Sequence, residues 1–311
     1  MPCSLDEIAH RLAGISGVEV RRDVPLAPFN AYRIGGPARI LVAPRKIEAV
    51  GHVLAQVREC GQPLMILGGG TNILFSDRGW EGIALQIDRN LSGWRFDGLK
   101  LRVLAGTWLL DLIRAVIGRG LSGMERMAGI PGTVGGALRM NAGAFDQEIE
   151  SVTLDVQGFN RNGEPFQATR KDIDFGYRCA PALEKVVITS AVLRLKPGDT
   201  VDLQHRMEAT LRRRALKQPL EYPSCGSVFK RPPNDYAGRL IEAAGLKGAR
   251  IGGAMVSPKH AGFIINFDRA TAADIHQLIL KIENEVYARF GVRLEREVKL
   301  IGDFSGSAPV R

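Results

Sequence analysis

The chain has 311 residues, of which 45% are apolar and 24% are charged, so it is long enough for two or three domains and too apolar to be disordered. Lysine and arginine exceed aspartate and glutamate by nine, which favours anionic partners. The basic residues are spread along the chain and only 6% of residues are aromatic, so we expect phosphorylated small molecules as ligands and no nucleic acid.

The cysteine and hydropathy patterns predict a cytoplasmic protein. The four cysteines include no C-x-x-C pair, so they support neither a metal site nor a disulfide framework. No signal peptide is evident, and no apolar run reaches the roughly 18 residues of a membrane helix. We expect a monomer without a membrane partner.

The first part of the chain alternates short strands with helices. Residues 1–22 are predicted to form an amphipathic helix, because Leu5, Ile8 and Leu12 have helical spacing. Glycines that follow the next two helices are typical of helix C-termini. We predict strands at residues 38–42, 64–67, 82–87 and 101–105, and helices at 47–60 and 108–119.

The pattern changes after residue 122. Residues 123–145 are rich in glycine, and we expect little regular structure there. Asn162-Gly163 between two apolar runs predicts a β-hairpin over residues 152–169. The remaining predicted elements are strands at 186–195, 254–256, 263–266 and 294–301, helices at 203–216, 236–244 and 272–290, and a loop at 224–233. Thr271 is a suitable N-cap for the helix at 272–290.

The first motif is a glycine run that follows a predicted buried strand. It consists of Gly68, Gly69, Gly70, Thr71 and Asn72. Glycines allow the backbone to approach a ligand closely, and successive N–H groups can surround phosphate oxygens. We favour a phosphate cradle over a simple tight turn, although the run is neither a Rossmann fingerprint nor a P-loop.

The second motif lies within residues 129–144. Its candidate ligand-binding residues are Gly129, Pro131, Gly132, Thr133, Gly135 and Gly136, and Asn141 follows them. Each glycine in a regular element costs about 1 kcal/mol relative to alanine, so compensating contacts are expected. Two separate glycine loops indicate a long ligand such as a dinucleotide.

Later segments, together with the glycine loops, carry a family resemblance. They are Phe175-Gly176-Tyr177-Arg178, Cys225-Gly226-Ser227-Val228-Phe229-Lys230 and Leu294-Glu295-Arg296-Glu297-Val298. In this order, the set closely resembles the UDP-N-acetylenolpyruvoylglucosamine reductase (UDP-N-acetylmuramate dehydrogenase) family over residues 25–302. The N-terminal segments Pro25–Asn30 and Ile34–Ala38 are also similar, and the short link after Arg178 resembles the type II branch.

The resemblance implies a fold class and a domain plan. The fold is α+β, with a two-part FAD-binding domain of the vanillyl-alcohol-oxidase / p-cresol methylhydroxylase type and a smaller α/β substrate-binding domain. We therefore expect an FAD-binding domain at residues 1–202, with subdomains at about 1–90 and 91–202. The C-terminal domain is expected at 203–303, and a flexible tail at 304–311.

The resemblance also implies an activity and its residues. The protein would use NADPH and non-covalent FAD to reduce UDP-N-acetylglucosamine enolpyruvate in peptidoglycan precursor synthesis. The family's catalytic residues fall on Arg178, Ser227 and Glu297. Substrate contacts are expected from Tyr177, Lys217, Asn141, Lys230 and His260. Arg231 and Gly262 stand where relatives often have asparagine, so the resemblance implies the reaction but not the substrate contacts at these two positions.

These residue types suit the chemistry. Hydride addition to an enol ether conjugated to a carboxylate places negative charge on the neighbouring carbon, which the protein must stabilise and then protonate. Arg178 can bind the carboxylate through two N–H groups, Ser227 can donate the proton, and Glu297 can orient the charged group or a water. Taken singly, Arg178 also fits a surface ion pair, Ser227 a turn cap, Glu297 a solvated edge and Lys217 a helix-dipole partner.

Two other function classes compete with this one. Another FAD-linked oxidoreductase of the same fold class would not need NADPH, and such oxidases often attach the flavin to a histidine or cysteine. None of the five histidines lies in the glycine loops, which argues against attachment to histidine. A nucleic-acid-binding protein is disfavoured because aromatic stacking residues are few. Cys225 has no histidine partner in the sequence pattern, so we interpret it as a small packing residue.

Overall fold

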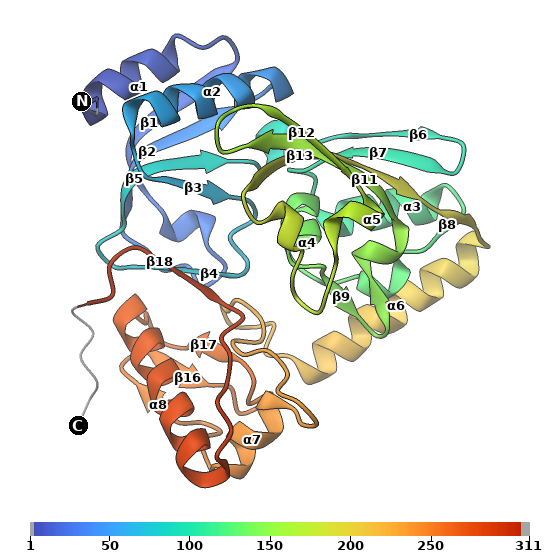
Figure 1. Cartoon of the computed structure of the whole chain (residues 1–311). Coiled ribbons are helices and arrows are strands. Elements are labelled where there is room, and N and C mark those ends of the chain that lie inside the picture. Colours follow the sequence, from blue (N-terminus) through green and yellow to red (C-terminus); the bar gives the residue numbers. More distant parts are fainter. Residues whose placement is uncertain (1–2, 306–311) are drawn as a thin grey trace. The chain divides into compact units, whose positions relative to one another are not determined.

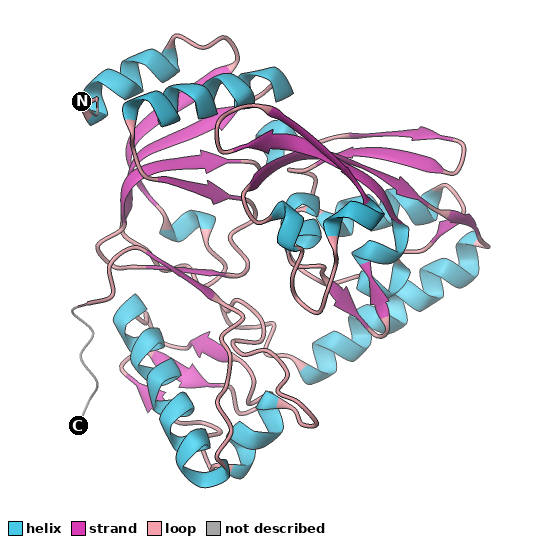
Figure 2. Ribbon diagram, in the orientation of Figure 1, coloured by secondary structure: helices cyan, strands magenta, loops and turns pink. Residues whose placement is uncertain are grey.

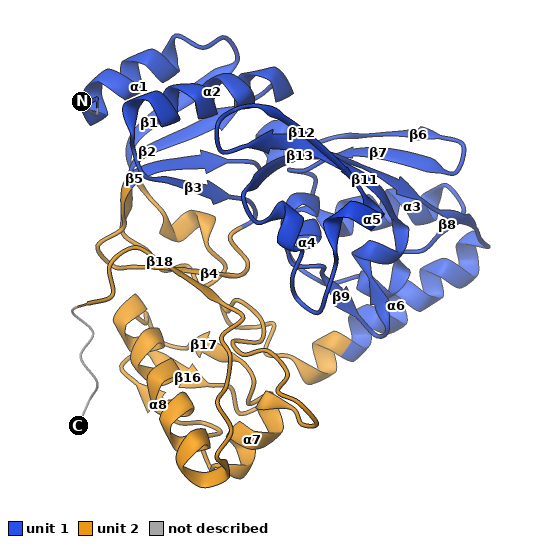
Figure 3. Ribbon diagram, viewed as in Figure 1, with its two compact units in different colours: residues 1–23, 39–69, 82–213 blue, residues 24–38, 70–81, 214–311 orange. Residues whose placement is uncertain are grey.

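A computed structural model describes residues 3–305, so the predicted tail lies largely outside the described residues. The chain forms two compact units, which are coloured separately in Figure 3. Unit 1 comprises residues 1–23, 39–69 and 82–213, and unit 2 comprises residues 24–38, 70–81 and 214–311. Two N-terminal segments therefore belong to the same unit as the C-terminal third. The division into domains at residue 202 stays a prediction.

The first sheet has the strand order β1-β2-β5-β3. Its strands are β1 (Val18–Pro25), β2 (Pro37–Pro44), β5 (Trp80–Gln86) and β3 (Leu64–Leu67), and β3 and β5 run parallel. The helices α1 (Leu5–Ala13) and α2 (Ile47–Cys60) lie on the same side of this sheet in Figure 1. Gly61 ends α2 with a φ of +61°, a left-handed value that suits glycine.

The predicted helix over residues 1–22 is wrong in its second half. α1 ends at Ala13, and β1 begins at Val18. Gly17 has a φ of +78° between the two elements, which ends helical geometry. Val18 and Val20 then alternate with charged residues, the period of a half-buried strand, and their β-branched side chains favour it.

A disulfide joins Cys3 to Cys60, contrary to the expectation that the cysteines would not pair. The Cα atoms of the two residues are 4.7 Å apart. Cys3 directly precedes the helix capped by Ser4, and Cys60 ends α2. Because α1 packs against α2, residues 57 positions apart meet, and no local pattern in the sequence reveals this.

The second sheet of unit 1 is antiparallel and has the order β12-β11-β13-β7-β6. Its strands are β12 (Pro165–Thr169), β11 (Thr153–Asn160), β13 (Val186–Arg194), β7 (Lys100–Leu104) and β6 (Trp94–Asp97). The predicted hairpin is confirmed, and Gly163 in its turn has a φ of +84°. Figure 2 shows this twisted sheet in magenta with helices packed nearby.

Short elements occupy the stretch in which little regular structure was expected. They are α4 (Val134–Arg139), the paired strands β9 (Gly143–Ala144) and β10 (Gln147–Glu148), and the 3-10 helix η3 (Glu125–Met127). Unit 1 also contains α3 (Leu109–Gly118), α5 (Arg170–Ile173), the pair β8 (Leu121–Ser122) and β14 (Lys196–Pro197), and the 3-10 helices η2 (Arg89–Leu91), η4 (Ile149–Val152) and η5 (Pro181–Leu183). The long helix α6 (Thr200–Lys217) begins in unit 1 and ends in unit 2.

Unit 2 contains a small antiparallel sheet, the helices α7 (Ala237–Ala243) and α8 (Ala272–Phe290), the 3-10 helix η1 (Ala27–Phe29) and the end of α6. The sheet has the order β15 (Arg250–Ile251), β16 (Ala254–Val256) and β17 (Ile264–Asn266). A separate parallel pair joins β4 (Ile73–Phe75) to β18 (Lys299–Ile301). The predicted strand at 294–301 is therefore shorter, since residues 294–298 make one isolated bridge, Phe229 with Arg296.

Each unit has its own apolar core. In unit 1 the core runs through both sheets and includes Ile8, Val53, Ile83 and Leu112, all fully buried. In unit 2 the apolar face of α8, from Ile275 to Val286, packs over the small sheet. Thr271 caps α8, as predicted, by accepting a hydrogen bond from the Asp274 N–H.

Candidate active site

Gly68 and Gly69 of the first glycine loop lie beside the second loop within unit 1. A Cβ atom built on Gly69 would lie 3.0 Å from the Cα atom of Gly132 and 3.5 Å from the ring of Trp108. A Cβ atom on Gly68 would lie 2.9 Å from the hydroxyl of Thr133. The loops therefore approach more closely than side chains would permit, and the glycines have a steric reason to be there.

The second loop is fixed to the scaffold by backbone hydrogen bonds. The carbonyl of Gly132 accepts the N–H of Leu109 at 3.0 Å, and the N–H of Gly135 donates to the carbonyl of Ala105 at 2.8 Å. Gly129 and Gly132 have φ values of +80° and +109°, which disfavour any side chain. Gly132 and Thr133 are buried, whereas Pro131 and Gly136 are exposed.

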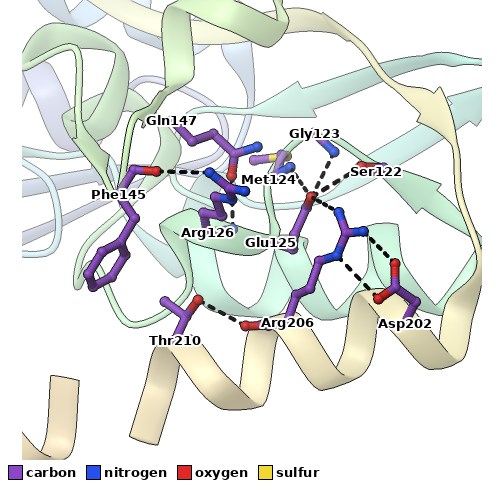
Figure 4. Close-up of polar contacts among 10 residues, drawn as sticks. All are labelled: Ser122, Gly123, Met124, Glu125, Arg126, Phe145, Gln147, Asp202, Arg206 and Thr210. Carbon is purple, nitrogen blue, oxygen red and sulfur yellow. Dashed lines mark hydrogen bonds and ion pairs between the residues drawn. The ribbon is translucent and has the colours of Figure 1, made fainter. Parts of the chain in front are cut away.

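A buried carboxylate organises the turn that precedes this loop (Figure 4). Glu125 is 4% exposed and accepts hydrogen bonds from the N–H groups of Gly123 and Met124 at 2.9 and 3.0 Å, and from the Ser122 hydroxyl at 3.2 Å. Arg206 of α6 lies 3.9 Å away. Burial would raise the pKa of Glu125, but these hydrogen bonds outweigh it and lower the pKa. Glu125 is therefore held ionised, and its side chain ties the start of η3 to residues 122–124.

The third glycine of the first loop belongs to unit 2. Gly70 has a φ of +62°, and a Cβ atom there would lie 1.8 Å from the carbonyl oxygen of Phe29. The side chain of Asn72 donates to the backbone carbonyl of Glu297 at 3.1 Å, and the N–H of Lys299 donates to the carbonyl of Asn72 at 3.0 Å. One end of the predicted phosphate loop is thus bonded to the segment that carries a predicted catalytic residue.

Ser227 and Glu297 are brought together in unit 2. The carbonyl of Val228 accepts the N–H of Glu297 at 2.8 Å, and Ser227 forms a bridge with Phe263. Gly226 precedes the serine with a φ of +76° and open space around it. Ser227 is exposed and Glu297 is half-buried. The two predicted catalytic residues thus lie on neighbouring, hydrogen-bonded segments.

The predicted substrate residues of unit 2 lie around the same segments. Lys230 pairs with Glu295 through both its backbone N–H at 2.8 Å and its ammonium group at 2.6 Å. His260 accepts the N–H of Gly262 at 3.2 Å, and burial lowers its pKa. Lys217, at the end of α6, is exposed. The positive charge on Lys217 makes a smaller contribution that also lowers the pKa of His260.

Arg178 and Tyr177 occupy the middle of a tight turn in unit 1. Gly176 and Cys179 exchange two backbone hydrogen bonds, at 3.1 and 3.3 Å, which close the turn. Arg178 has a φ of +56°, and its guanidinium donates to the carbonyl of Gly143 at 3.3 Å. Tyr177 is half exposed, and its ring lies 5.2 Å from the guanidinium.

Asn141, which we expected to contact substrate, is fully buried. Its side-chain N–H groups donate to the carboxylate of Glu148 at 2.8 Å and to the carbonyl of Gly176 at 3.1 Å. These contacts indicate a structural role, which the sequence pattern did not distinguish from ligand contact.

Cys225 is buried beside Gly70 and Ile73 of unit 2, in agreement with the packing role. Its thiol donates to the carbonyl of Ile73 at 3.2 Å, and burial raises its pKa to about 12. A thiol with this pKa is not a nucleophile at neutral pH.

Within residues 3–305 no group of three or more His, Cys, Asp or Glu side chains is arranged to bind a metal. Nor does any helix in those residues have the length and apolar character to span a membrane.

Two protein families match parts of this chain, and one of the matches covers the glycine loops. Residues 38–168 match the FAD binding domain family, and residues 218–301 match the C-terminal domain of UDP-N-acetylenolpyruvoylglucosamine reductase. The first match contains both glycine loops, residues 68–72 and 129–144. The steric fit of Gly69 against Gly132 and the positive φ values of the second loop suit a cofactor held by backbone groups.

Relatives that align with this chain over nearly their whole length are named UDP-N-acetylenolpyruvoylglucosamine reductase. The UDP-N-acetylenolpyruvoylglucosamine reductase of Caldicellulosiruptor bescii is 42% identical over 93% of this chain and 93% of its own length. That of Streptococcus thermophilus is 41% identical over 96% of this chain and 97% of its own. The crystal structure of the enzyme from Thermus caldophilus aligns with a TM-score of 0.74 and 32% identity, covering 92% of this chain and 99% of that chain.

The matches confirm the predicted fold class, an FAD-binding domain of the p-cresol methylhydroxylase type with a separate C-terminal domain, and they confirm FAD as the cofactor. Since relatives at this identity align along nearly the whole chain, the protein is an oxidoreductase that belongs to the UDP-N-acetylenolpyruvoylglucosamine reductase family.

Proposed function

We propose that this protein reduces UDP-N-acetylglucosamine enolpyruvate to UDP-N-acetylmuramate, a peptidoglycan precursor, with NADPH as co-substrate. The observation that carries the proposal is the hydrogen bond at 2.8 Å between the Glu297 N–H and the Val228 carbonyl, which sets Glu297 beside the Ser227 segment. A small hydroxyl and a carboxylate on adjacent segments suit protonation of a charged carbon. Action as a cytoplasmic monomer remains a prediction.

The glycine loops would hold FAD. Gly69 of the first loop and Gly132 of the second approach each other as bare backbone, and the Thr133 hydroxyl lies beside Gly68. Bound there, FAD would supply the chemistry of hydride transfer from NADPH to the substrate. Trp108 donates to Asp88 at 2.7 Å beside these loops, and this bond limits the movement of the ring next to Gly69.

The remaining chemistry belongs to side chains of the chain itself. Arg178 binds the substrate carboxylate and stabilises the negative charge that develops beside it. Ser227 donates a proton to the substrate carbon that carries this negative charge. Because Ser227 is exposed, the substrate can reach its hydroxyl. Glu297 orients the charged group or a water molecule. Lys217, at the end of α6, binds the substrate diphosphate, and Lys230, His260 and Tyr177 contact the rest of the substrate.

The half-reactions separate these roles. A Ser227→Ala variant should take hydride from NADPH at nearly the normal rate, because no substrate proton is needed in that step. Its flavin should be reoxidised by the enolpyruvyl substrate about 100- to 10,000-fold more slowly. Stopped-flow absorbance measures both steps, and Ser224→Ala in the same loop is the matched control. Slow flavin reduction with normal reoxidation would exclude Ser227 as the proton donor.

A further inference from the structure

Asn141 lies directly after α4 in an uncommon backbone conformation. Its φ is +39°, in the left-handed region that asparagine tolerates better than most residues. The side chain is 0% exposed, and both ends of its amide are bonded. The oxygen accepts the N–H of Glu150 at 3.3 Å, while the nitrogen donates to Glu148 and to the carbonyl of Gly176.

The bond to Gly176 reaches the first residue of the turn that presents Arg178. Arg178 has a φ of +56° there, a conformation that costs a non-glycine residue free energy and persists only when its surroundings hold it. Gly176 N–H and carbonyl already pair with Cys179, so the Asn141 amide adds a second hydrogen bond to the same carbonyl.

The same short segment also contacts the head of the arginine. Two residues after Asn141, the carbonyl of Gly143 accepts a hydrogen bond from the Arg178 guanidinium at 3.3 Å. The segment 141–143 therefore bonds both the base of the Arg178 turn and the end of its side chain. A shift of Asn141 would move both contacts together.

We propose that Asn141 is a positioning residue for Arg178: it fixes the strained turn so that the guanidinium meets the substrate carboxylate in one orientation. In this role Asn141 acts through Arg178 and does not touch the substrate. The inference rests on the proposed function, in which Arg178 binds that carboxylate.

The informative variant is Asn141→Gly, because glycine accepts the positive φ and only the amide is lost. The variant should keep its FAD and its rate of flavin reduction by NADPH. Reoxidation by the enolpyruvyl substrate should slow by about 10- to 100-fold, since misplacement by about 1 Å can cost that much. Asn234→Gly is the matched control, because Asn234 is exposed and has a φ of +60°.

A double-mutant cycle distinguishes positioning from general damage. In an Arg178→Ala background, Asn141→Gly should change reoxidation by less than about 3-fold, since no guanidinium remains to be placed. An equal slowing in both backgrounds would overturn the inference. If Arg178→Ala alone left reoxidation normal, the role of Arg178 in the proposed function would fail instead. Should Asn141→Gly not fold, Asn141→Ser serves, because it removes the amide without adding a negative charge beside Glu148 and Glu150, and the same outcomes apply.

Discussion

The close approach of the two glycine loops makes Gly69 a sharp test of the flavin site. In a Gly69→Val variant, the Cβ atom alone would lie 3.0 Å from the Cα atom of Gly132 and 3.5 Å from the N–H nitrogen of Thr133. The valine methyls extend about 1.5 Å further. Since the nearest neighbours are backbone atoms, the loops must separate, and such overpacking typically costs about 1–3 kcal/mol.

The expected product is a folded protein without colour. That cost is a fraction of the stability of a core of this size, but a separation of the loops removes the surface that FAD would contact. Absorbance at 450 nm relative to 280 nm measures flavin content, and circular dichroism measures the thermal midpoint. Gly118→Val is the control, because Gly118 is exposed at the end of α3 and a Cβ atom built there would have no neighbour within 4 Å. Full flavin occupancy in Gly69→Val would refute the assignment of this loop.

Two further predictions concern charged residues. Glu125→Gln should lower stability by about 2–4 kcal/mol, because a buried carboxylate with three hydrogen bonds is replaced by an amide that cannot accept them all. Because folding lowers the pKa of Glu125, its contribution is present above the unfolded pKa of about 4.3 and is lost as the pH falls through the folded pKa. The difference in thermal midpoint between wild type and variant should therefore shrink at low pH, and a constant difference would contradict this. Lys217→Ala should raise the KM for the UDP-sugar and weaken its salt dependence, while NADPH oxidation by an artificial acceptor stays normal; an unchanged KM would leave Lys217 only a role at the helix end.

Periodicity and cap residues predicted the elements whose signals are local. The helix at 47–60 ends at Gly61 and the helix at 272–290 begins after Thr271, both as expected. The strands at 64–67 and 254–256 also have the predicted bounds. In these elements the apolar pattern and the residues at the termini favour the same structure that the tertiary contacts stabilise, so the local sequence was enough to predict them.

Elements that depend on distant partners were missed. The strand Ile73–Phe75 exists because it pairs with Lys299–Ile301 at the other end of the sequence, and three residues carry no period of their own. Cys3 and Cys60 likewise meet only because α1 packs against α2. A single sequence gives no signal for contacts of this kind.

In the candidate site, too, local sequence signals were predictable and contacts between distant residues were not. The glycine loops were visible because runs of glycine are costly without a purpose, but the contact between Gly69 and Gly132 was not. Asn141 was grouped with ligand-binding residues because it follows the second loop, whereas its burial gives it internal partners. Glu125 resembles any surface glutamate in the sequence, and only the turn at 122–124 shows why it is buried.

The visible spectrum of the purified protein is the decisive measurement for the proposed reaction. We predict a flavin absorbance near 450 nm, which NADPH bleaches under anaerobic conditions and UDP-N-acetylglucosamine enolpyruvate restores, with UDP-N-acetylmuramate as the product. UDP-N-acetylglucosamine, which lacks the enolpyruvyl group, is the matched control and should restore nothing. A flavin that NADPH bleaches but the enolpyruvyl substrate does not restore would contradict the proposed function.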